Sequence, residues 1–372
     1  MDGSSPRAVS LRQGGATLTT IVLATQAAAV APQSALEPSG PAAAEIARLW
    51  DIMAWLGGGI SVVVIALLLY ALLRRRRPDE LPPEADRPPD PRGELTNVES
   101  AGGGREESGR PRSERLGARW MVAGGIAFPT VVLTALFVLS LDSLGALYPR
   151  GNADGVFTVE VIGRQWWWDV RYLDTAPQRI VPSANEIHIP VGQRVRVLLR
   201  SDDVIHSFWV PGLQGKMDMI PGRTTVTWLQ ADSAGTWRGQ CAEYCGMQHA
   251  KMALVVVAEP PEQFARWLAS EARPAVPPAD SALAADREAF LQSGCVLCHT
   301  VRGTPARGGT GPDLTHVASR RTLAAGELPN TLGNLYGWIA NPQALKPGSH
   351  MPAVEMTPGQ LHAIARYVAS LR

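Results

Sequence analysis

The stretch Cys241-Ala-Glu-Tyr-Cys-Gly-Met-Gln-His249-Ala-Lys-Met252 is the most informative part of this chain, and His206 precedes it by 35 residues. Together they offer two thiolates, two imidazoles and one thioether. Soft sulfur combined with imidazole suits copper, and a weak Met ligand beside Cys and His is typical of copper that transfers electrons. A single blue copper normally uses one Cys, so the second Cys favours two thiolates that bridge two ions. The residues alone leave a mononuclear and a dinuclear centre open.

A second metal-binding motif, Cys295-Val-Leu-Cys298-His299, follows 50 residues later. It is the attachment signature of a c-type haem, in which both thiols bind the vinyl groups and the histidine lies over the iron. The two motifs use all four cysteines of the chain. The alternative, two structural disulfides, does not explain why each cysteine pair is followed by a histidine. Two redox centres on one chain predict an electron-transfer protein.

Two uncharged runs of 22 residues, 52–73 and 120–141, precede these motifs. Each is long enough, at about 1.5 Å per residue, to cross a hydrocarbon core about 30 Å thick. Pro129 is expected to kink the second helix. The connection 74–119 carries 11 arginines, so the positive-inside rule predicts that it is cytoplasmic and that both termini lie outside. Its composition is typical of disorder, and we assign it no site.

The first 31 residues have the pattern of a signal peptide. Arg7 and Arg12 precede an apolar stretch at 16–30, and Ala29-Val-Ala31 is a small-residue cleavage site. We therefore expect a multi-pass protein of a bacterial cell membrane, with a two-helix hairpin at 49–142 and with its redox domains on the outer face. The net charge of +1 says little about partners, and we expect no nucleic acid among them.

The hydrophobic pattern changes to a period of two from residue 156 to residue 258. Alternating apolar runs such as 187–191 and 195–199 are separated by turn signals such as Pro211-Gly212 and Pro221-Gly222. Short strands with this punctuation predict an antiparallel sandwich or barrel. The metal-binding residues would lie in loops that join the strands. A rigid β scaffold suits electron transfer, because fixed ligands limit rearrangement when the charge changes.

Over residues 49–269 the chain resembles subunit II of the haem–copper cytochrome c oxidases. The resemblance rests on the two membrane helices and on four stretches, namely Gln165-Trp-Trp-Trp168, His206-Ser-Phe-Trp209, Lys216-Met-Asp-Met-Ile-Pro-Gly-Arg223 and Cys241 to Met252. It implies a cupredoxin-like all-β barrel at 150–270 with a dinuclear copper A centre. Cys241 and Cys245 would bridge the two ions. The terminal ligands would be His206, His249, Met252 and the backbone carbonyl of Glu243.

The resemblance also implies roles for residues around the centre. The Glu243 side chain would face a magnesium or manganese ion shared with subunit I, the alternative being an ordinary solvent-exposed carboxylate. Trp166 would be the surface residue for electron input, with Trp167 and Trp168 as packing residues. His188 lies apart from the motif and is expected to be an ordinary surface histidine.

A second redox domain is expected at 281–372, after a short helix at 262–270 and a Pro/Ala-rich linker at 272–280. Three stretches resemble class I cytochromes c, which are all-α: Gly311-Pro-Asp-Leu314, Trp338-Ile-Ala-Asn-Pro342 and Lys346-Pro-Gly-Ser-His-Met351-Pro352. They make Met351 the expected distal ligand of haem c, opposite His299, with His350 and Met356 as competitors. A Met/His pair raises the haem potential. Helices are expected at 282–292 and 358–371, packed through Phe290 and Tyr367, with His316 and His362 at the surface.

The resemblance implies subunit II of a terminal oxidase with a fused cytochrome c. Electrons would pass from haem c to copper A and on to subunit I, where oxygen is reduced and protons are pumped. Other oxidase subunits are the expected partners, and a soluble or membrane-bound cytochrome c or a quinol–cytochrome c reductase is the expected donor. The alternatives are the corresponding subunit of a copper A nitric oxide reductase and a copper chaperone. A fused haem domain could also cover Trp166.

Overall fold

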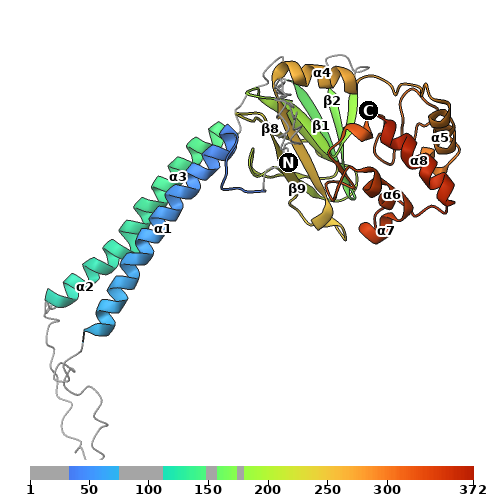
Figure 1. The fold of residues 1–372 in the computed structure, drawn as a ribbon. Coiled ribbons are helices and arrows are strands. Elements are labelled where there is room, and N and C mark those ends of the chain that lie inside the picture. Colours follow the sequence, from blue (N-terminus) through green and yellow to red (C-terminus); the bar gives the residue numbers. More distant parts are fainter. Residues whose placement is uncertain (1–32, 75–111, 148–156, 174–179) are drawn as a thin grey trace, which may run out of the picture.

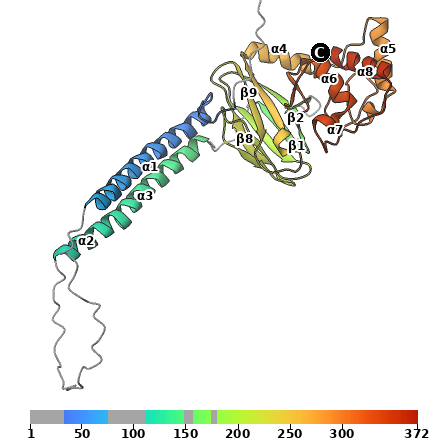
Figure 2. The ribbon, with the colours of Figure 1, turned by 60° about the horizontal axis from the view of Figure 1, so that its bottom comes forward.

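The computed structural model describes residues 33–74, 112–147, 157–173 and 180–372, and it has three parts (Figure 1). A long helical hairpin projects from a β sandwich, and a small helical domain lies against the sandwich on the side away from the hairpin (Figures 1 and 2). The expected signal peptide and most of the connection 74–119 lie outside the described residues.

The hairpin consists of α1 (Pro41–Leu73) and a second helix made of α2 (Arg112–Val122), a π-helical turn (Ala123–Ala127) and α3 (Phe128–Leu147). Both helices are long and apolar enough to cross a membrane by length and composition. At about 1.5 Å per residue, α1 is about 50 Å long, which exceeds a hydrocarbon core of about 30 Å. The irregularity expected at Pro129 is a π turn in which Phe128 N–H donates to Ala123, and prolines and π bulges are common sites of helix distortion.

A short strap, residues 33–40, joins α1 to the β sandwich. The Ser39 N–H donates to Gly212 at 2.7 Å, and the Asp232 N–H donates to Ser39 at 3.0 Å. Gly40 packs so closely that a Cβ at this position would lie 2.2 Å from the carbonyl oxygen of Gln230. On the hairpin itself, Ser143 of α3 donates to Glu45 of α1. The two apolar helices are therefore fastened to each other, and α1 is fastened to the β domain.

The β domain has two five-stranded sheets. One has the order β3-β2-β1-β5-β8, and the other has the order β4-β10-β9-β6-β7. The first contains β1 (Thr158–Arg164), β2 (Trp167–Leu173), β3 (Val181–Ala184), β5 (Val195–Ser201) and β8 (Thr225–Leu229). The second contains β4 (Glu186–Pro190), β6 (His206–Trp209), β7 (Met217–Met219), β9 (Gly235–Cys241) and β10 (Ala253–Glu259).

The predicted antiparallel arrangement is wrong for two strand pairs. β1 runs parallel to β5, and β10 runs parallel to β4. The sequence could not reveal this, because alternation of apolar residues reports which face of a strand is buried and not its direction. The predicted sandwich is confirmed, and alternate residues of β2, including Trp168 and Tyr172, fill its core.

The helix α4 (Pro261–Glu271) packs on β3, β4 and β10 and closes one side of the sandwich. It covers His188, which is only 6% exposed, so the prediction of a surface histidine is wrong. The His188 ring stacks on Trp267 at 3.9 Å, and its two nitrogens lie 2.9 Å from Glu186 and 3.3 Å from Glu259. Burial alone would lower the pKa of His188, but the hydrogen bonds and charges of both carboxylates outweigh burial and raise it.

The C-terminal domain, residues 281–372, is mainly helical, as expected, and is called the cytochrome domain below after the family that it resembles. Its helices are α5 (Ser281–Leu291), α6 (Leu332–Ala340), α7 (Pro342–Leu345) and α8 (Pro358–Ser370), with a two-residue ladder of β11 (Thr322–Leu323) and β12 (Leu328–Pro329). The expected packing of α8 on α5 is confirmed, since the rings of Phe290 and Tyr367 lie 5.3 Å apart. A Thr357–Gln360 capping box begins α8.

The cytochrome domain is docked on the β domain. The Ala253 N–H at the start of β10 donates to Ala325 at 2.9 Å, and the Arg321 N–H donates to the Glu186 carboxylate at 2.9 Å. The His316 ring lies 2.9 Å from the carbonyl oxygen of Arg273, just after α4. His316 is therefore 4% exposed, which corrects its predicted surface position, whereas His362 is exposed as expected.

The environment of His188 predicts a pH-dependent stability. A histidine whose pKa is raised on folding contributes stability that is present below its unfolded-state pKa and is lost as the pH rises through its folded-state pKa. The unfolding temperature of the β domain should therefore fall as the pH rises above about 6.5. We expect His188→Gln to flatten this dependence in calorimetric scans, whereas His362→Gln should retain it. Equal slopes for the two variants would contradict this account.

Candidate copper and haem sites

Three neighbouring strands bring the copper-ligand candidates together. His206 is the first residue of β6, Cys241 is the last residue of β9, and Met252 directly precedes β10. The Cys241 N–H donates to the Met252 carbonyl at 2.9 Å, which closes the base of the intervening loop. Gly163 of β1 makes room for the His206 ring, since a Cβ there would lie 2.7 Å from its Cδ2. The spacing read from the sequence therefore becomes one compact cluster.

The expected ligand atoms lie in contact with one another. The sulfurs of Cys241 and Cys245 are 3.7 Å apart. Four further contacts complete the cluster: Cys241 Sγ with His206 Nδ1 at 3.8 Å and with the Glu243 carbonyl at 3.1 Å, and Cys245 Sγ with His249 Nδ1 at 3.7 Å and with Met252 Sδ at 3.9 Å. Two N or S ligands about 2.0–2.3 Å from one ion are separated by about 3.3–3.8 Å in tetrahedral geometry. These spacings therefore fit ligands that share metal ions.

The two thiols depend on each other for their charge. The Cys245 hydrogen bond lowers the pKa of Cys241, and the same interaction with Cys241 raises the pKa of Cys245. Two thiolates 3.7 Å apart repel one another, so the second ionises readily only when a cation compensates the charge. The donor set is soft and buried, with an imidazole on each sulfur, and it fits copper.

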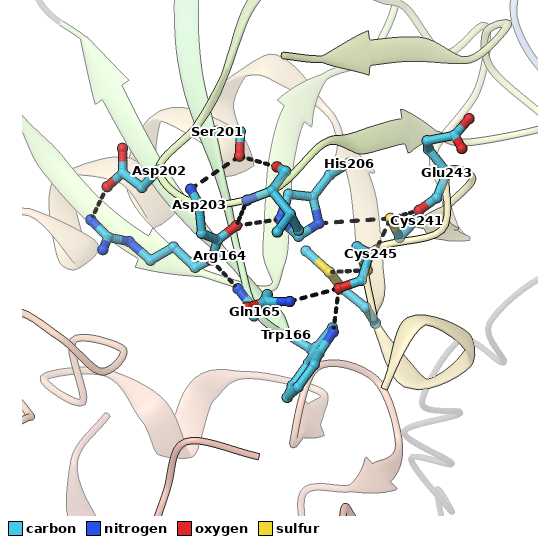
Figure 3. A network of polar contacts seen from close by, with 12 residues as sticks. Arg164, Gln165, Trp166, Ser201, Asp202, Asp203, His206, Cys241, Glu243 and Cys245 are labelled. Carbon is cyan, nitrogen blue, oxygen red and sulfur yellow. Dashed lines mark hydrogen bonds and ion pairs between the residues drawn. The ribbon is translucent and has the colours of Figure 1, made fainter. Parts of the chain in front are cut away.

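Asp203 orients His206 and was missed by the sequence reasoning. Its Oδ1 lies 2.7 Å from His206 Nε2, which leaves Nδ1 directed at the sulfur of Cys241 (Figure 3). Its other oxygen accepts from the Gln165 N–H at 2.6 Å. Hydrogen bonds of this kind fix the ring orientation of metal-ligating histidines. Two adjacent carboxylates precede the candidate histidine, Asp202 by four residues and Asp203 by three, and the sequence does not tell which of them contacts its ring.

Trp166, in the turn between β1 and β2, packs against the 241–252 ligand loop and is covered by the cytochrome domain. Its Nε1–H donates to the Cys245 carbonyl at 3.0 Å, and the Gln165 amide donates to the same oxygen at 2.8 Å (Figure 3). The residue is only 9% exposed, and its ring lies 5.5 Å from that of His350. The expected surface tryptophan is therefore a covered one in this chain. Trp168 packs in the core as expected, and Trp167 is half-buried beside Arg164.

The Glu243 side chain is exposed and its carbonyl faces Cys241. Among the residues that the structure describes, the metal-competent group of histidine, cysteine and carboxylate side chains is His206, Cys241 and Cys245. Nothing in the described chain supports a magnesium or manganese ion.

The haem motif is folded around His299. Its Nδ1 lies 2.8 Å from the Pro312 carbonyl, so this nitrogen holds the proton and Nε2 keeps its lone pair for iron. Burial lowers the pKa of His299, which also favours the neutral ring. A Cβ on Gly311 would lie 2.7 Å from the His299 ring, so the loop is closely fitted to it. These features fit an axial haem ligand.

Met351 follows α7 in the segment that precedes α8. Its carbonyl accepts from Gln343 at 2.8 Å. Of its competitors, His350 is directed at Trp166, and Met356 packs against the apolar core of the cytochrome domain. The distal role of Met351 stays a prediction.

Comparisons with known proteins match both the β domain and the helical domain. A model described as cytochrome c oxidase subunit II, periplasmic domain, matches residues 172–259, and a cytochrome c model matches residues 284–372. Cytochrome c oxidase subunit 2 of Alkalihalophilus pseudofirmus is 30% identical over 347 residues, which cover 91% of each chain. The chain belongs to the cytochrome c oxidase subunit 2 family.

Two further relatives have the same description. Cytochrome c oxidase subunit 2 of Bacillus sp. (strain PS3) is 30% identical over 258 residues, covering 66% of this chain and 70% of that protein. The crystal structure of the periplasmic domain of subunit II of cytochrome oxidase from Bradyrhizobium japonicum is 32% identical, with a TM-score of 0.30, and covers 32% of this chain and 95% of that chain.

As a subunit 2 of the haem–copper oxidases, this chain is part of an oxidoreductase and associates with other oxidase subunits. The two motif matches imply copper in the β domain and haem in the helical domain. Its two apolar helices fit a membrane protein.

The contacts of Asp203 predict a selective loss of copper affinity. Asp203→Asn replaces the charged carboxylate that orients His206 with a neutral amide that has one acceptor oxygen for two donors, and disturbing such a partner typically weakens metal binding about 10–100-fold. Competition with a copper chelator on the full chain measures the change. Asp202→Asn is the matched control, because Asp202 pairs with Arg164 at 2.6 Å and not with His206. Equal losses in the two variants would contradict the orienting role.

Proposed function

We propose that this chain receives electrons through haem c, passes them to a dinuclear copper A centre, and delivers them to the oxygen-reducing, proton-pumping subunit I. The observation that carries the proposal is the convergence of four further ligand groups on two cysteine sulfurs in contact, directly beneath a docked cytochrome domain. When bound, both groups supply reversible one-electron transfer, and the copper centre shares its electron between two ions.

The residues of the chain have complementary roles in this proposal. Cys241, Cys245, His206, His249, Met252 and the Glu243 carbonyl hold copper, and Cys295, Cys298, His299 and Met351 hold haem c. Full burial of His206 and Met252 excludes water from one side of the copper cluster. Pro312 holds a proton on His299 Nδ1, and Asp203 holds one on His206 Nε2. A magnesium or manganese ion against the Glu243 carboxylate remains conditional on subunit I.

The proposed setting is the cell membrane of a bacterium, with the β and cytochrome domains on the outer face. The arginine-rich connection between the helices supports a cytoplasmic loop. A quinol–cytochrome c reductase, or a soluble or membrane-bound cytochrome c, is the proposed donor. Trp166 is covered in this chain, so it serves as a contact between the domains rather than as a landing site.

Electron paramagnetic resonance tests the copper assignment. The copper-loaded full chain in its oxidised form should show hyperfine splitting from two equivalent copper nuclei, beside the separate signal of ferric haem c. The reason is that two thiolates 3.7 Å apart suit ions that share one electron. Cys245→Ser should convert this signal into that of a single copper. Single-copper splitting in the fully loaded native chain would exclude copper A and favour a copper-delivery role.

Loss of Met351 tests the order of electron flow. Met351→Ala lowers the haem potential by removing its thioether ligand, and we expect slower reduction of copper by an external cytochrome c in stopped-flow traces. Each decrease of 1.4 kcal/mol in driving force changes the equilibrium constant for the transfer about tenfold. The copper absorption bands should stay unchanged, because Met351 is not in the copper cluster. Met356→Ala is the control, and an unchanged rate in Met351→Ala would mean that electrons bypass the haem.

A further inference from the structure

The segment that begins at the last residue of α7 forms the centre of the contact between the two redox domains. It spans residues 345–351 and carries the predicted haem ligand Met351. Its Leu345 carbonyl accepts from the Lys251 ammonium at 2.8 Å, and its Pro347 carbonyl accepts from the Gln248 side chain. Gln248 and Lys251 both belong to the copper-ligand loop. The two ligand-bearing loops are therefore in direct contact.

Lys346 lies at the middle of this contact and is 3% exposed. Its Nζ donates to three backbone carbonyls, those of Trp166 at 2.9 Å, Lys251 at 2.6 Å and Ala324 at 3.0 Å. The first two belong to the β domain, and the third belongs to the cytochrome domain. One ammonium thus joins Trp166, which directly precedes β2, to the copper-ligand loop and to the turn between β11 and β12.

The chemistry of this site requires lysine. An ammonium has three donors around one nitrogen, whereas a guanidinium is planar and cannot direct its N–H groups at three convergent carbonyls from one point. The chain has only three lysines, Lys216, Lys251 and Lys346, among its 35 lysines and arginines. Two of the three donate across this contact. Arginine supplies nearly all the other positive charge of the chain.

The burial of Lys346 makes its partners essential. A buried ammonium is costly unless its donors are satisfied, and the carbonyls that accept from it would be left unsatisfied if it were removed. Burial lowers the pKa of Lys346 to about 8, with nearby Glu327 acting in the opposite direction. The three carbonyl acceptors favour the charged form, so the ammonium predominates at pH 7.

We propose that Lys346 is a positioning residue that fastens the haem-ligand segment onto the copper-ligand loop and so keeps the cytochrome domain docked over Trp166. The proposal rests on the proposed function for its consequence, which is a fixed path between the two redox sites. The docking itself does not depend on that function, because Lys346 and its acceptors all belong to this chain and hold its two domains together. Docking of this kind prevents a soluble donor from reaching Trp166.

Amine labelling of the native full chain with copper and haem bound tests the docking directly. Acetylation by an N-hydroxysuccinimide ester, followed by mass spectrometry, reports each lysine separately, and exposed Lys216 is the internal reference. We expect Lys346 and Lys251 to react at least about tenfold more slowly than Lys216, because reaction requires the contact to open. Labelling of Lys346 as fast as Lys216 would overturn the proposal without any variant.

The variant Lys346→Met keeps the length of the side chain and removes the ammonium. We expect Lys251 to lose its protection and haem-to-copper electron transfer after flash reduction to slow about tenfold or more, a change of about 1.4 kcal/mol or more. Both absorption spectra should stay native, which general unfolding would alter. Lys216→Met removes an exposed charge and should leave the labelling of Lys251 and Lys346 unchanged.

The two readouts separate this proposal from the proposed function. Loss of Lys251 protection without any haem-to-copper transfer in the native chain would support the docking role and contradict the electron route. Full protection of Lys251 in Lys346→Met, with native transfer, would overturn the positioning role and leave the electron route standing. A variant that fails to fold leaves the decision to the labelling of native Lys346.

Discussion

The structure depends on keeping two cysteine sulfurs 3.7 Å apart in a buried place. A thiol and an adjacent thiolate share one proton readily, but two adjacent thiolates need a cation. The surrounding fold holds each sulfur from a different direction. Cys241 ends a central strand and is fixed by sheet hydrogen bonds, whereas Cys245 lies in the loop, where its carbonyl accepts from Gln165 and Trp166. The metal preference of the domain follows from this arrangement.

The carbonyl of Cys245 also connects the copper cluster to the rest of the molecule. Its two donors belong to adjacent residues of one turn, and the N–H of the first is bound by Asp203, which orients His206. The second donor, Trp166, offers its own carbonyl to a residue of the cytochrome domain. A short series of hydrogen bonds therefore runs from His206 through the 241–252 loop to the C-terminal domain. A displacement at either end changes the position of the same few atoms.

The sequence was sufficient where the chemistry is local. The Cys241 to Met252 spacing predicted the cluster around the two sulfurs, because a short loop between fixed strands has few ways to bring its side chains together. It was insufficient where packing against elements distant in the sequence decides whether a residue is buried. His188 and His316 have polar side chains in segments that resemble a surface, and only the docking of α4 and the cytochrome domain buries them. Asp203 could not be distinguished from Asp202, since their partners lie on different elements.

The strap at residues 33–40 has a consequence for assembly. Because Ser39 is bonded on both sides to the β domain and Gly40 leaves no space for a side chain, the chain enters α1 without slack. The strap therefore fixes the position of the β domain, and of its copper-ligand candidates, relative to the start of α1. A partner subunit that packs along the hairpin would meet the copper-ligand candidates at a fixed distance from the helices. Inserting residues into the strap would change the distance between the hairpin and the copper-ligand candidates, and it would leave the arrangement of those candidates unchanged.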